Sequence, residues 1–170
     1  ELQWGGTNFV FSSADHVLLN KLGTVTVETQ NNIFLGLNSL TIPLTSGTGN
    51  TGMGDIAGLS LTTGSSNTLM GTGTLTTETS GSQNTAIGFN ALTLQATSSN
   101  NTALGYLAGA SQASYTNCTF IGSGADASVN GLTNAIAIGY NASVGQNNSL
   151  ILGNGAIVGI GTSTPNTSAI

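Results

Sequence analysis

Charged side chains are scarce in this chain, and their scarcity excludes several classes of function. Only 4% of the 170 residues are Asp, Glu, Lys or Arg, whereas typical domains contain roughly 25%. Lys21 is the single Lys or Arg residue, and the net charge is −5. Binding to nucleic-acid phosphates needs a basic surface, and attraction to anionic lipid headgroups needs one as well. We therefore expect neither a nucleic-acid partner nor binding to a membrane surface.

Long apolar runs, histidine and cysteine are equally scarce. No apolar stretch approaches the roughly 18 residues that suggest a membrane-spanning helix, so no membrane insertion is expected. His16 and Cys118 are each the only residue of their type, and they are far apart in the sequence. This excludes an internal disulfide, and one His with one Cys does not make a metal site. Cys118 precedes a short apolar segment, where we expect a small packed residue.

Catalytic signatures are missing too. The acidic residues do not align in pairs, which disfavours a glycosidase-type carboxylate pair. A Ser-His-Asp arrangement could use only His16, and no serine lies in a nucleophile-elbow motif. The glycines do not form a phosphate-binding loop, because no Gly-Lys-Ser/Thr follows them. The sequence predicts a protein that is not an enzyme and that uses no cofactor.

What the chain does contain is a motif repeated in register. The pentapeptide Asn-Thr-Ala-Ile-Gly at 84–88 is the clearest copy, and Asn-Thr-Ala-Leu-Gly follows at 101–105. The glycines that end the copies are separated by one step of 18 residues, five of 17 and one of 14, and they are Gly36, Gly54, Gly71, Gly88, Gly105, Gly122, Gly139 and Gly153. The residues that carry the repeat include Asn67, Asn84, Asn101 and Asn134. A fixed period in this range indicates a repeat architecture.

Residues at fixed offsets from these glycines share size and polarity. The residue before each glycine is large and apolar, and we expect these residues to form an inward column: Leu35, Met53, Met70, Ile87, Leu104, Ile121, Ile138 and Leu152. The residue three positions after each glycine is small, which predicts a column with little room: Ser39, Ala57, Thr74, Ala91, Ala108, Ala125, Ala142 and Ala156. The glycines themselves suit positive φ or a close backbone approach. The asparagines suit a corner of the coil and a hydrogen-bonded ladder between coils.

The short apolar run of each copy suits a strand and is too short for a helix. Each coil reads as a short strand, a turn, a second short strand and a polar loop. Coils of this kind stack about 4.8 Å apart, and only neighbouring coils can bury a core. The sequence therefore predicts an all-β parallel solenoid of about eight coils of ~17 residues over 31–157.

Two further columns vary along the chain. Three residues before each glycine, Thr occupies the five middle copies and aliphatic residues occupy the ends: Ile33, Thr51, Thr68, Thr85, Thr102, Thr119, Ile136 and Leu150. If this column faces the interior of the roll or of a trimer, its hydroxyls can bond between coils. The residue after the glycine includes Phe89, Tyr106 and Tyr140. These aromatic residues would stand on one edge, either packed between chains or as an exposed stripe.

The repeats resemble a known family. Residues 134–142, Asn-Ala-Ile-Ala-Ile-Gly-Tyr-Asn-Ala, are similar to the head repeat of trimeric autotransporter adhesins of the YadA type, and 148–153 fit the same pattern. The Asn-Thr-Ala-Ile-Gly form with its 17-residue period resembles a variant in trimeric phage and bacterial tail-fibre proteins. The resemblance covers about residues 31–157. It implies a left-handed parallel β-roll, three chains side by side as a homotrimer, and a role in surface attachment.

The period departs from that family. The adhesin head repeat is usually shorter and close to the final 14-residue step of this chain. The additional residues are expected to lengthen one loop per coil, and the loops between coils would stack into one polar face.

The two ends lie outside the repeat. Residues 1–30 contain short β-branched or aromatic runs bounded by turn residues, which predict two or three strands capping the roll. Residues 158–170 resemble the linker that follows such repeats in phage tail fibres. There it often precedes a C-terminal intramolecular chaperone that assembles the trimer and is then cleaved off.

The sequence favours a trimeric fibre or adhesin head that attaches to a cell-surface glycan or receptor, outside the cell or on a virion. Aromatic residues favour binding surfaces, which makes Trp4, Phe9, Phe11 and Tyr115 candidates for ligand contact, although they would serve equally in a small core. The alternative is a structural fibre spacer without a ligand. An ice-binding solenoid is disfavoured because Thr forms only one rank. A β-helix acyltransferase is disfavoured because no histidine lies within the coils.

Overall fold

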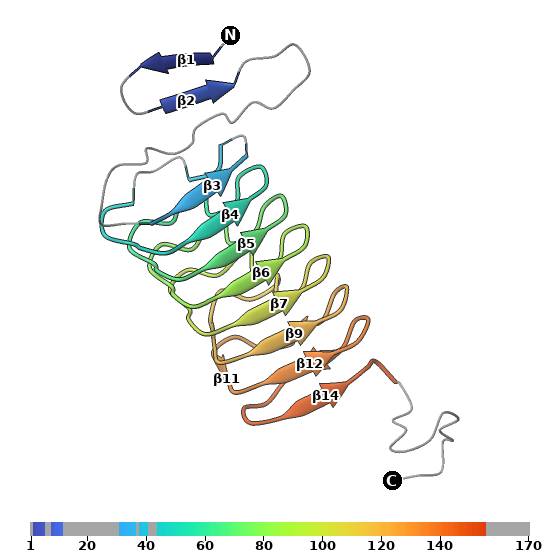
Figure 1. Cartoon of the computed structure of the whole chain (residues 1–170). Coiled ribbons are helices and arrows are strands. Elements are labelled where there is room, and N and C mark those ends of the chain that lie inside the picture. The colour runs from blue at the N-terminus through green and yellow to red at the C-terminus, as the bar shows by residue number, and fades with distance from the viewer. Residues whose placement is uncertain (1, 6–7, 12–30, 37, 41–43, 156–170) are drawn as a thin grey trace, which may run out of the picture.

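The computed structural model describes residues 2–5, 8–11, 31–36, 38–40 and 44–155, and this part of the chain contains strands and turns but no helix. Eight short strands, one from each coil, form a single parallel sheet along the length of the molecule (Figure 1). In spatial order they are β3 (Ile33–Leu35), β4 (Thr51–Met53), β5 (Thr68–Met70), β6 (Thr85–Ile87), β7 (Thr102–Leu104), β9 (Thr119–Ile121), β12 (Ile136–Ile138) and β14 (Leu150–Leu152). The chain is a parallel β-solenoid, as its sequence predicts.

Adjacent strands pair without any shift in register. Thr85 in β6 lies opposite Thr102 in β7, and Ile87 lies opposite Leu104. The same offset relates β4 to β5 and β7 to β9. Because every coil returns to the same place, equivalent side chains stack into columns along the solenoid axis.

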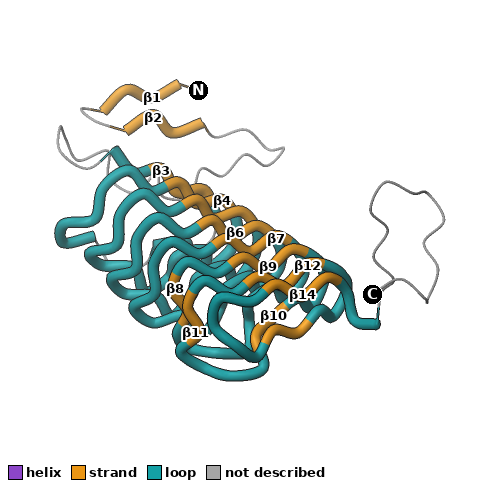
Figure 2. The backbone as a smooth tube through the Cα atoms, turned by 90° about the horizontal axis from the view of Figure 1, so that it is seen from below, coloured by secondary structure: helices purple, strands orange, loops and turns teal. Residues whose placement is uncertain are grey.

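Two further two-stranded parallel sheets are formed by the later coils of the described chain (Figure 2). β8 (Tyr115–Thr116) pairs in parallel with β11 (Leu132–Thr133), and β10 (Asp126–Ala127) pairs in parallel with β13 (Ser143–Val144). The sequence predicted a second strand in every coil, and this prediction was too general. The coils that precede β8 carry Gly-Thr, Gly-Ser or Ser-Ser at the positions of Tyr-Thr and Leu-Thr. Gly and Ser favour strands much less than aromatic and β-branched residues do.

The side of the sheet that faces the interior differs from the prediction. The middle residue of each strand points inward, and Phe34, Leu69 and Phe120 are buried there. The column before the glycines, predicted to face inward, points outward instead, with Met70 47% and Leu104 45% exposed. Side chains alternate across a strand, so the first and third residues share one face. The Thr column therefore lies beside the apolar column on the outer face and does not line the interior of the roll.

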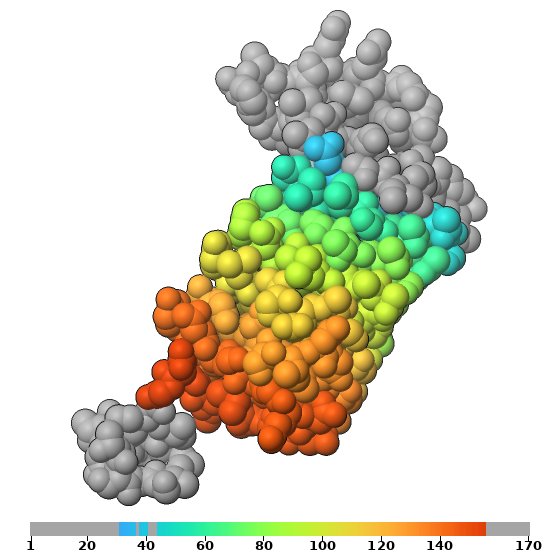
Figure 3. Space-filling view, turned by 180° about the vertical axis from the view of Figure 1, so that it is seen from behind, coloured from blue at the N-terminus to red at the C-terminus, as the bar shows by residue number. Residues whose placement is uncertain are grey.

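Turn residues complete the core on the far side of the interior. The small residues three positions after the glycines are buried as predicted from Ser39 through Ala142, while Ala156 lies outside the described residues. Leu61, Leu75 and Leu92 are fully buried from the turns. Cys118 is buried too, as expected of a small packed residue. The rod-like body that results is continuous from the first coil to the last (Figure 3).

The motif glycines confirm the prediction of positive φ and close approach. Their φ angles from Gly36 to Gly139 lie between 120° and 151°. A Cβ atom on Gly88 would lie 2.2 Å from the carbonyl oxygen of Gly105 on the next coil. Only a residue without a side chain lets the two backbones come this close.

The predicted asparagine ladder is present in the interior. The Oδ1 atom of Asn50 accepts a hydrogen bond from the backbone N–H of Asn67 at 2.9 Å. The Oδ1 atom of Asn67 accepts one from the backbone N–H of Asn84 in the same way. The Nδ2 group of Asn67 donates to the carbonyl oxygen of Gly81 at 2.9 Å. Asn101 ends the series by accepting the backbone N–H of Cys118 at 2.9 Å.

The asparagines of the last copies belong to a different column. Asn117, Asn134 and Asn148 have φ angles between 53° and 56° and occupy the corner just before the ladder position. Asn134 donates from its exposed side chain to Oδ1 of Asn148 at 3.0 Å. In these coils the ladder position holds Cys118, Ala135 or Ser149. The last three copies have one more residue between Asn and Gly than the earlier copies do, and this residue occupies the ladder position, so the strands keep their length.

The described N-terminal residues form a hairpin. β1 (Leu2–Gly5) pairs antiparallel with β2 (Asn8–Phe11), in agreement with the strands predicted within residues 1–30. Residues 12–30 and 156–170 are outside the described residues, and so are most of the predicted cap and the whole predicted linker 158–170.

Candidate functional site

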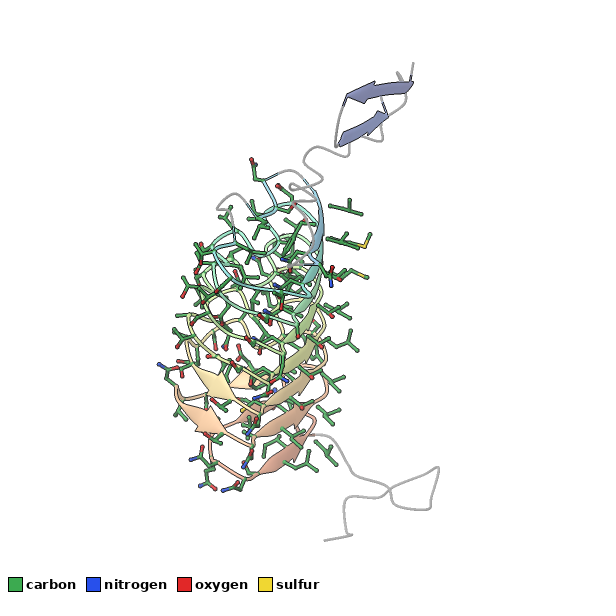
Figure 4. The ribbon with its side chains drawn as sticks, turned by 60° about the vertical axis from the view of Figure 1, so that its left-hand side comes forward. Carbon is green, nitrogen blue, oxygen red and sulfur yellow. The ribbon has the colours of Figure 1, made fainter. Side chains whose placement is uncertain are left out.

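The outer face of the eight-stranded sheet is a regular surface that runs along the described solenoid. It consists of the Thr-rich column and the apolar column that precedes the glycines. Its side chains project from the sheet in a row along the solenoid (Figure 4). Several are large and exposed, namely Ile33, Met53, Met70, Leu104, Ile138, Leu150 and Leu152. Extended apolar patches on a soluble protein mark interaction surfaces.

This outer face carries no charge. All its residues in the eight strands are Thr, Ile, Leu or Met. The strand lengths and the register are uniform, so the face presents the same two residue positions at each coil. A surface of this kind has little to offer a charged ligand and suits a partner with a flat, apolar face.

An aromatic stripe lies at the corner beyond the motif glycines. The rings of Phe89 and Tyr106 stack, with centroids 5.6 Å apart and planes 12° from parallel. Tyr106 is 54% and Tyr140 72% exposed. Ser123 occupies the same position on the coil between these two tyrosines. In the single chain, the aromatic residues thus form an exposed stripe with one gap.

The described structure pairs two of the four sequence-predicted ligand contacts and places a third in the core. Within the hairpin, Trp4 lies opposite Phe9 in the strand pairing, and Phe11 lies opposite Leu2. Tyr115 is in a different region, within β8 of the solenoid. It is fully buried, and its ring packs at a tilt on Phe120 with centroids 4.7 Å apart. A side chain without exposed surface has nothing to offer a ligand from solution, so Tyr115 belongs to the core.

The hydroxyl group of Tyr115 has an internal partner. It donates to Oδ1 of Asp126 at 2.7 Å, and the second carboxylate oxygen of Asp126 accepts the backbone N–H of Ser111 at 2.9 Å. Burial and the negative charge of Asp126 together raise the pKa of Tyr115 well above its ordinary value. The phenol therefore stays protonated and joins two neighbouring coils as a structural donor.

Glu78 is a buried carboxylate that sequence reasoning treated only as a scattered acid. It is fully buried, and its Oε1 atom accepts the backbone N–H of Gly81 at 2.6 Å and that of Ser80 at 3.2 Å. Its Oε2 atom accepts the N–H of Ser98 from the next coil at 3.1 Å. Removal from water raises the pKa of Glu78, and these hydrogen bonds offset part of the rise. The 17-residue period could have predicted this burial, because Glu78 lies 17 residues after the buried Leu61 and so occupies the equivalent position of the next coil.

The environment of Glu78 contains polar groups but no counter-ion. The described residues include no Lys, Arg or His, because Lys21 and His16 both lie outside them. Gln95 is buried at the equivalent position of the next coil, and its Oε1 atom has no hydrogen-bond partner within the described structure. Glu78 is therefore a structural carboxyl held by backbone N–H groups. Among the described residues, the other carboxylates are Asp55 and Asp126, and both lie at other positions on other coils, so neither forms a carboxylate pair with Glu78.

The predicted polar loops are bonded from coil to coil. The hydroxyl oxygen of Ser82 accepts the backbone N–H of Ser65 at 2.9 Å, and that of Ser99 accepts the N–H of Ser82 at 3.0 Å. The hydroxyl group of Thr62 donates to the carbonyl oxygen of Thr79 at 2.8 Å. Many loop hydroxyls thus stabilise the stack, which reduces the number available to a ligand on that face.

Comparison with protein-family models, curated proteins and solved structures gives no significant match. Over the described ranges, no helix has the length and apolar character needed to cross a bilayer. The same ranges contain no cluster of three or more His, Cys, Asp or Glu side chains arranged to hold a metal ion. Assignment of a function therefore depends on the surfaces of the solenoid.

Proposed function

We propose that this chain is the head domain of a trimeric extracellular fibre that attaches to a cell-surface ligand, either a glycan or a receptor. The observation that carries the proposal is the uncharged outer face of the sheet, which exposes an apolar side chain such as Met70 or Leu104 at successive coils. The resemblance of the repeats to adhesin heads and tail fibres supports three chains and a place on a cell surface or virion.

The energetics of the outer face favour association along its whole length. Burial of apolar surface contributes about 25 cal/mol per Å², and each coil adds a similar increment because the columns repeat. Flat faces with an identical repeat on every copy can meet in register from end to end. The Thr-rich column and the apolar column contain no charged residue, so association does not require a charged group to be removed from water.

A role in attachment follows from the remaining surfaces. When three sheet faces meet at an axis, the corners and loops of every coil stay on the outside. Loops and corners on a rigid scaffold are where binding groups usually lie. The aromatic stripe of Phe89, Tyr106 and Tyr140 is one such exposed feature.

Light scattering after size-exclusion chromatography tests the association. The expected result is a species with three times the mass of one chain that persists on dilution. A monomer at every concentration would contradict the trimer and remove the main support for the attachment role.

The alternative, a structural spacer without a ligand, has support from the loops, where many hydroxyls bond between coils. A glycan array and a binding assay on host cells separate the two functions. A stable trimer that binds neither would favour the spacer.

A further inference from the structure

We propose that the gap between Tyr106 and Tyr140 binds one sugar ring of a neutral saccharide, with Ser123 as its floor. The inference rests on the proposed attachment function and adds a location and a ligand class to it. It concerns the corner of the solenoid and not the outer sheet face.

The backbone fixes the spacing of the three residues. Gly124 N–H donates to the carbonyl oxygen of Tyr106 at 2.8 Å, and Asn141 N–H donates to that of Ser123 at 2.9 Å. Tyr106, Ser123 and Tyr140 therefore stand on successive coils in one column. With coils at the sheet spacing of about 4.8 Å, the two tyrosines are separated by roughly 9.6 Å.

The orientation of the Tyr106 ring follows from its stacking on Phe89, which lies on the preceding coil. Phe89 and Tyr106 are one coil apart, and their rings are stacked with planes 12° from parallel. One face of the Tyr106 ring is therefore covered by Phe89, and the opposite face is directed along the column toward the coil of Ser123. Tyr140, which is 72% exposed, stands at the far side of that coil.

The width of the gap selects the kind of ring that fits. Carbon atoms in favourable contact are about 3.5–4.0 Å apart, so a flat ring touching both tyrosines needs roughly 7–8 Å. The gap is wider than that. A puckered saturated ring such as a pyranose is thicker than an aromatic ring, and its C–H faces can pack on both tyrosines while its hydroxyl groups point to the rim.

The chemistry of the surroundings favours a neutral, hydroxylated ligand. Ser123 is exposed, and Asn141 beside Tyr140 is exposed too, so both offer polar groups near the gap. Aromatic faces also attract cations, but the described residues place no free carboxylate beside the gap to hold one. The nearest candidate in sequence, Asp126, already accepts hydrogen bonds from the Tyr115 hydroxyl and from Ser111 N–H.

Binding to the full chain is measured by saturation-transfer NMR with methyl pyranosides of glucose, galactose, mannose and N-acetylglucosamine, and with choline as a cationic probe. Ser123→Tyr places a third ring in the gap and blocks it. Tyr140→Ala removes one wall. Each change is expected to weaken pyranoside binding by about tenfold or more. Thr72→Ala, in the same column but two coils before Tyr106, is the control and should leave binding unchanged.

Several results would overturn this site, and the mass of the same samples separates them from failure of the proposed function. Pyranoside binding that survives Ser123→Tyr places the ligand elsewhere and leaves the attachment function intact. A trimer that binds none of the pyranosides, or that binds choline in their place, overturns the saccharide site but not the fibre. Loss of the trimer in Tyr140→Ala shows that the stripe packs between chains. A monomeric wild type contradicts the proposed function itself.

Discussion

Asn84 accepts the backbone N–H of Asn101 through its Oδ1 atom at 3.0 Å, across the boundary between two coils. Its Nδ2 group donates to the carbonyl oxygen of Ser98 at 2.8 Å. One buried side chain thus satisfies two backbone groups that water cannot reach.

Replacement of Asn84 by Ala is expected to destabilise the solenoid. The change leaves Asn101 N–H and Ser98 C=O buried without partners, and each such group costs about 1–3 kcal/mol. The free energy of unfolding, measured with denaturant, should fall by about 2 kcal/mol or more. Asn134→Gly is the matched control, because Asn134 is exposed and Gly keeps its positive φ. A loss in the control equal to that in Asn84→Ala would contradict a special role of the ladder.

Gly88→Ala is expected to be among the most damaging single changes in the repeat. The new Cβ would lie 2.2 Å from the carbonyl oxygen of Gly105, at a φ of +130°. The steric clash and the strain of a positive φ at a residue with a Cβ atom should together lower the free energy of unfolding by several kcal/mol.

Gly131→Ala separates the backbone effect from the steric one. Gly131 also has a positive φ of 77°, but a Cβ there would meet nothing within 4 Å. Its expected cost is about 1–2 kcal/mol, that of the left-handed conformation alone. Thermal unfolding of both variants checks the difference, and equal losses would show that close approach of the coils is unimportant.

Because of Glu78, we expect the free energy of unfolding to fall as pH rises. The pKa of its carboxyl is above the ordinary value of 4.5 in the folded chain, so the folded state holds the proton more tightly than the unfolded state. Between the unfolded and folded pKa values the free energy of unfolding therefore decreases with increasing pH. Unfolding of the wild type and of Glu78→Gln over a pH series measures this. The wild type should lose stability relative to the variant as pH rises through that window, and a difference independent of pH would contradict the prediction.

Leu104→Glu is expected to dissociate the proposed trimer while leaving each solenoid folded. The residue is 45% exposed on the outer sheet face, so a single chain can place the new carboxylate in water. In an apolar interface the same charge is costly to desolvate. Light scattering should give the mass of one chain, and circular dichroism should retain the β-sheet signal. Thr63→Glu, exposed in a polar loop, should keep the trimer.

Much of the fold could be predicted from the period alone. The spacing of Gly88, Gly105 and their equivalents indicates a solenoid, and their positive φ follows from the need for a residue without Cβ. The burial of Ala91 and Ala108 follows from the constant small size at that offset.

The inward side of the strands could not be predicted in the same way. Large apolar residues usually point inward, which led to the assignment of Ile87 and Leu104 to the core. The true inward column mixes small residues such as Ala86 and Ala103 with large ones such as Phe120, so no constant residue type marks it in the sequence. The burial of Glu78 was not predicted either, because an acidic residue is normally expected on the surface. Here backbone N–H groups donate hydrogen bonds to its carboxyl group in the interior.

Because the main sheet has an unshifted register, the number of coils sets the length of the molecule. Insertion or removal of one 17-residue coil, such as residues 68–84, would return the glycines and ladder asparagines to their places in the stack. The reach of the rod can therefore change in increments of about 4.8 Å by duplication or deletion of a short stretch of the gene. Its cross-section and its outer face stay the same in each case.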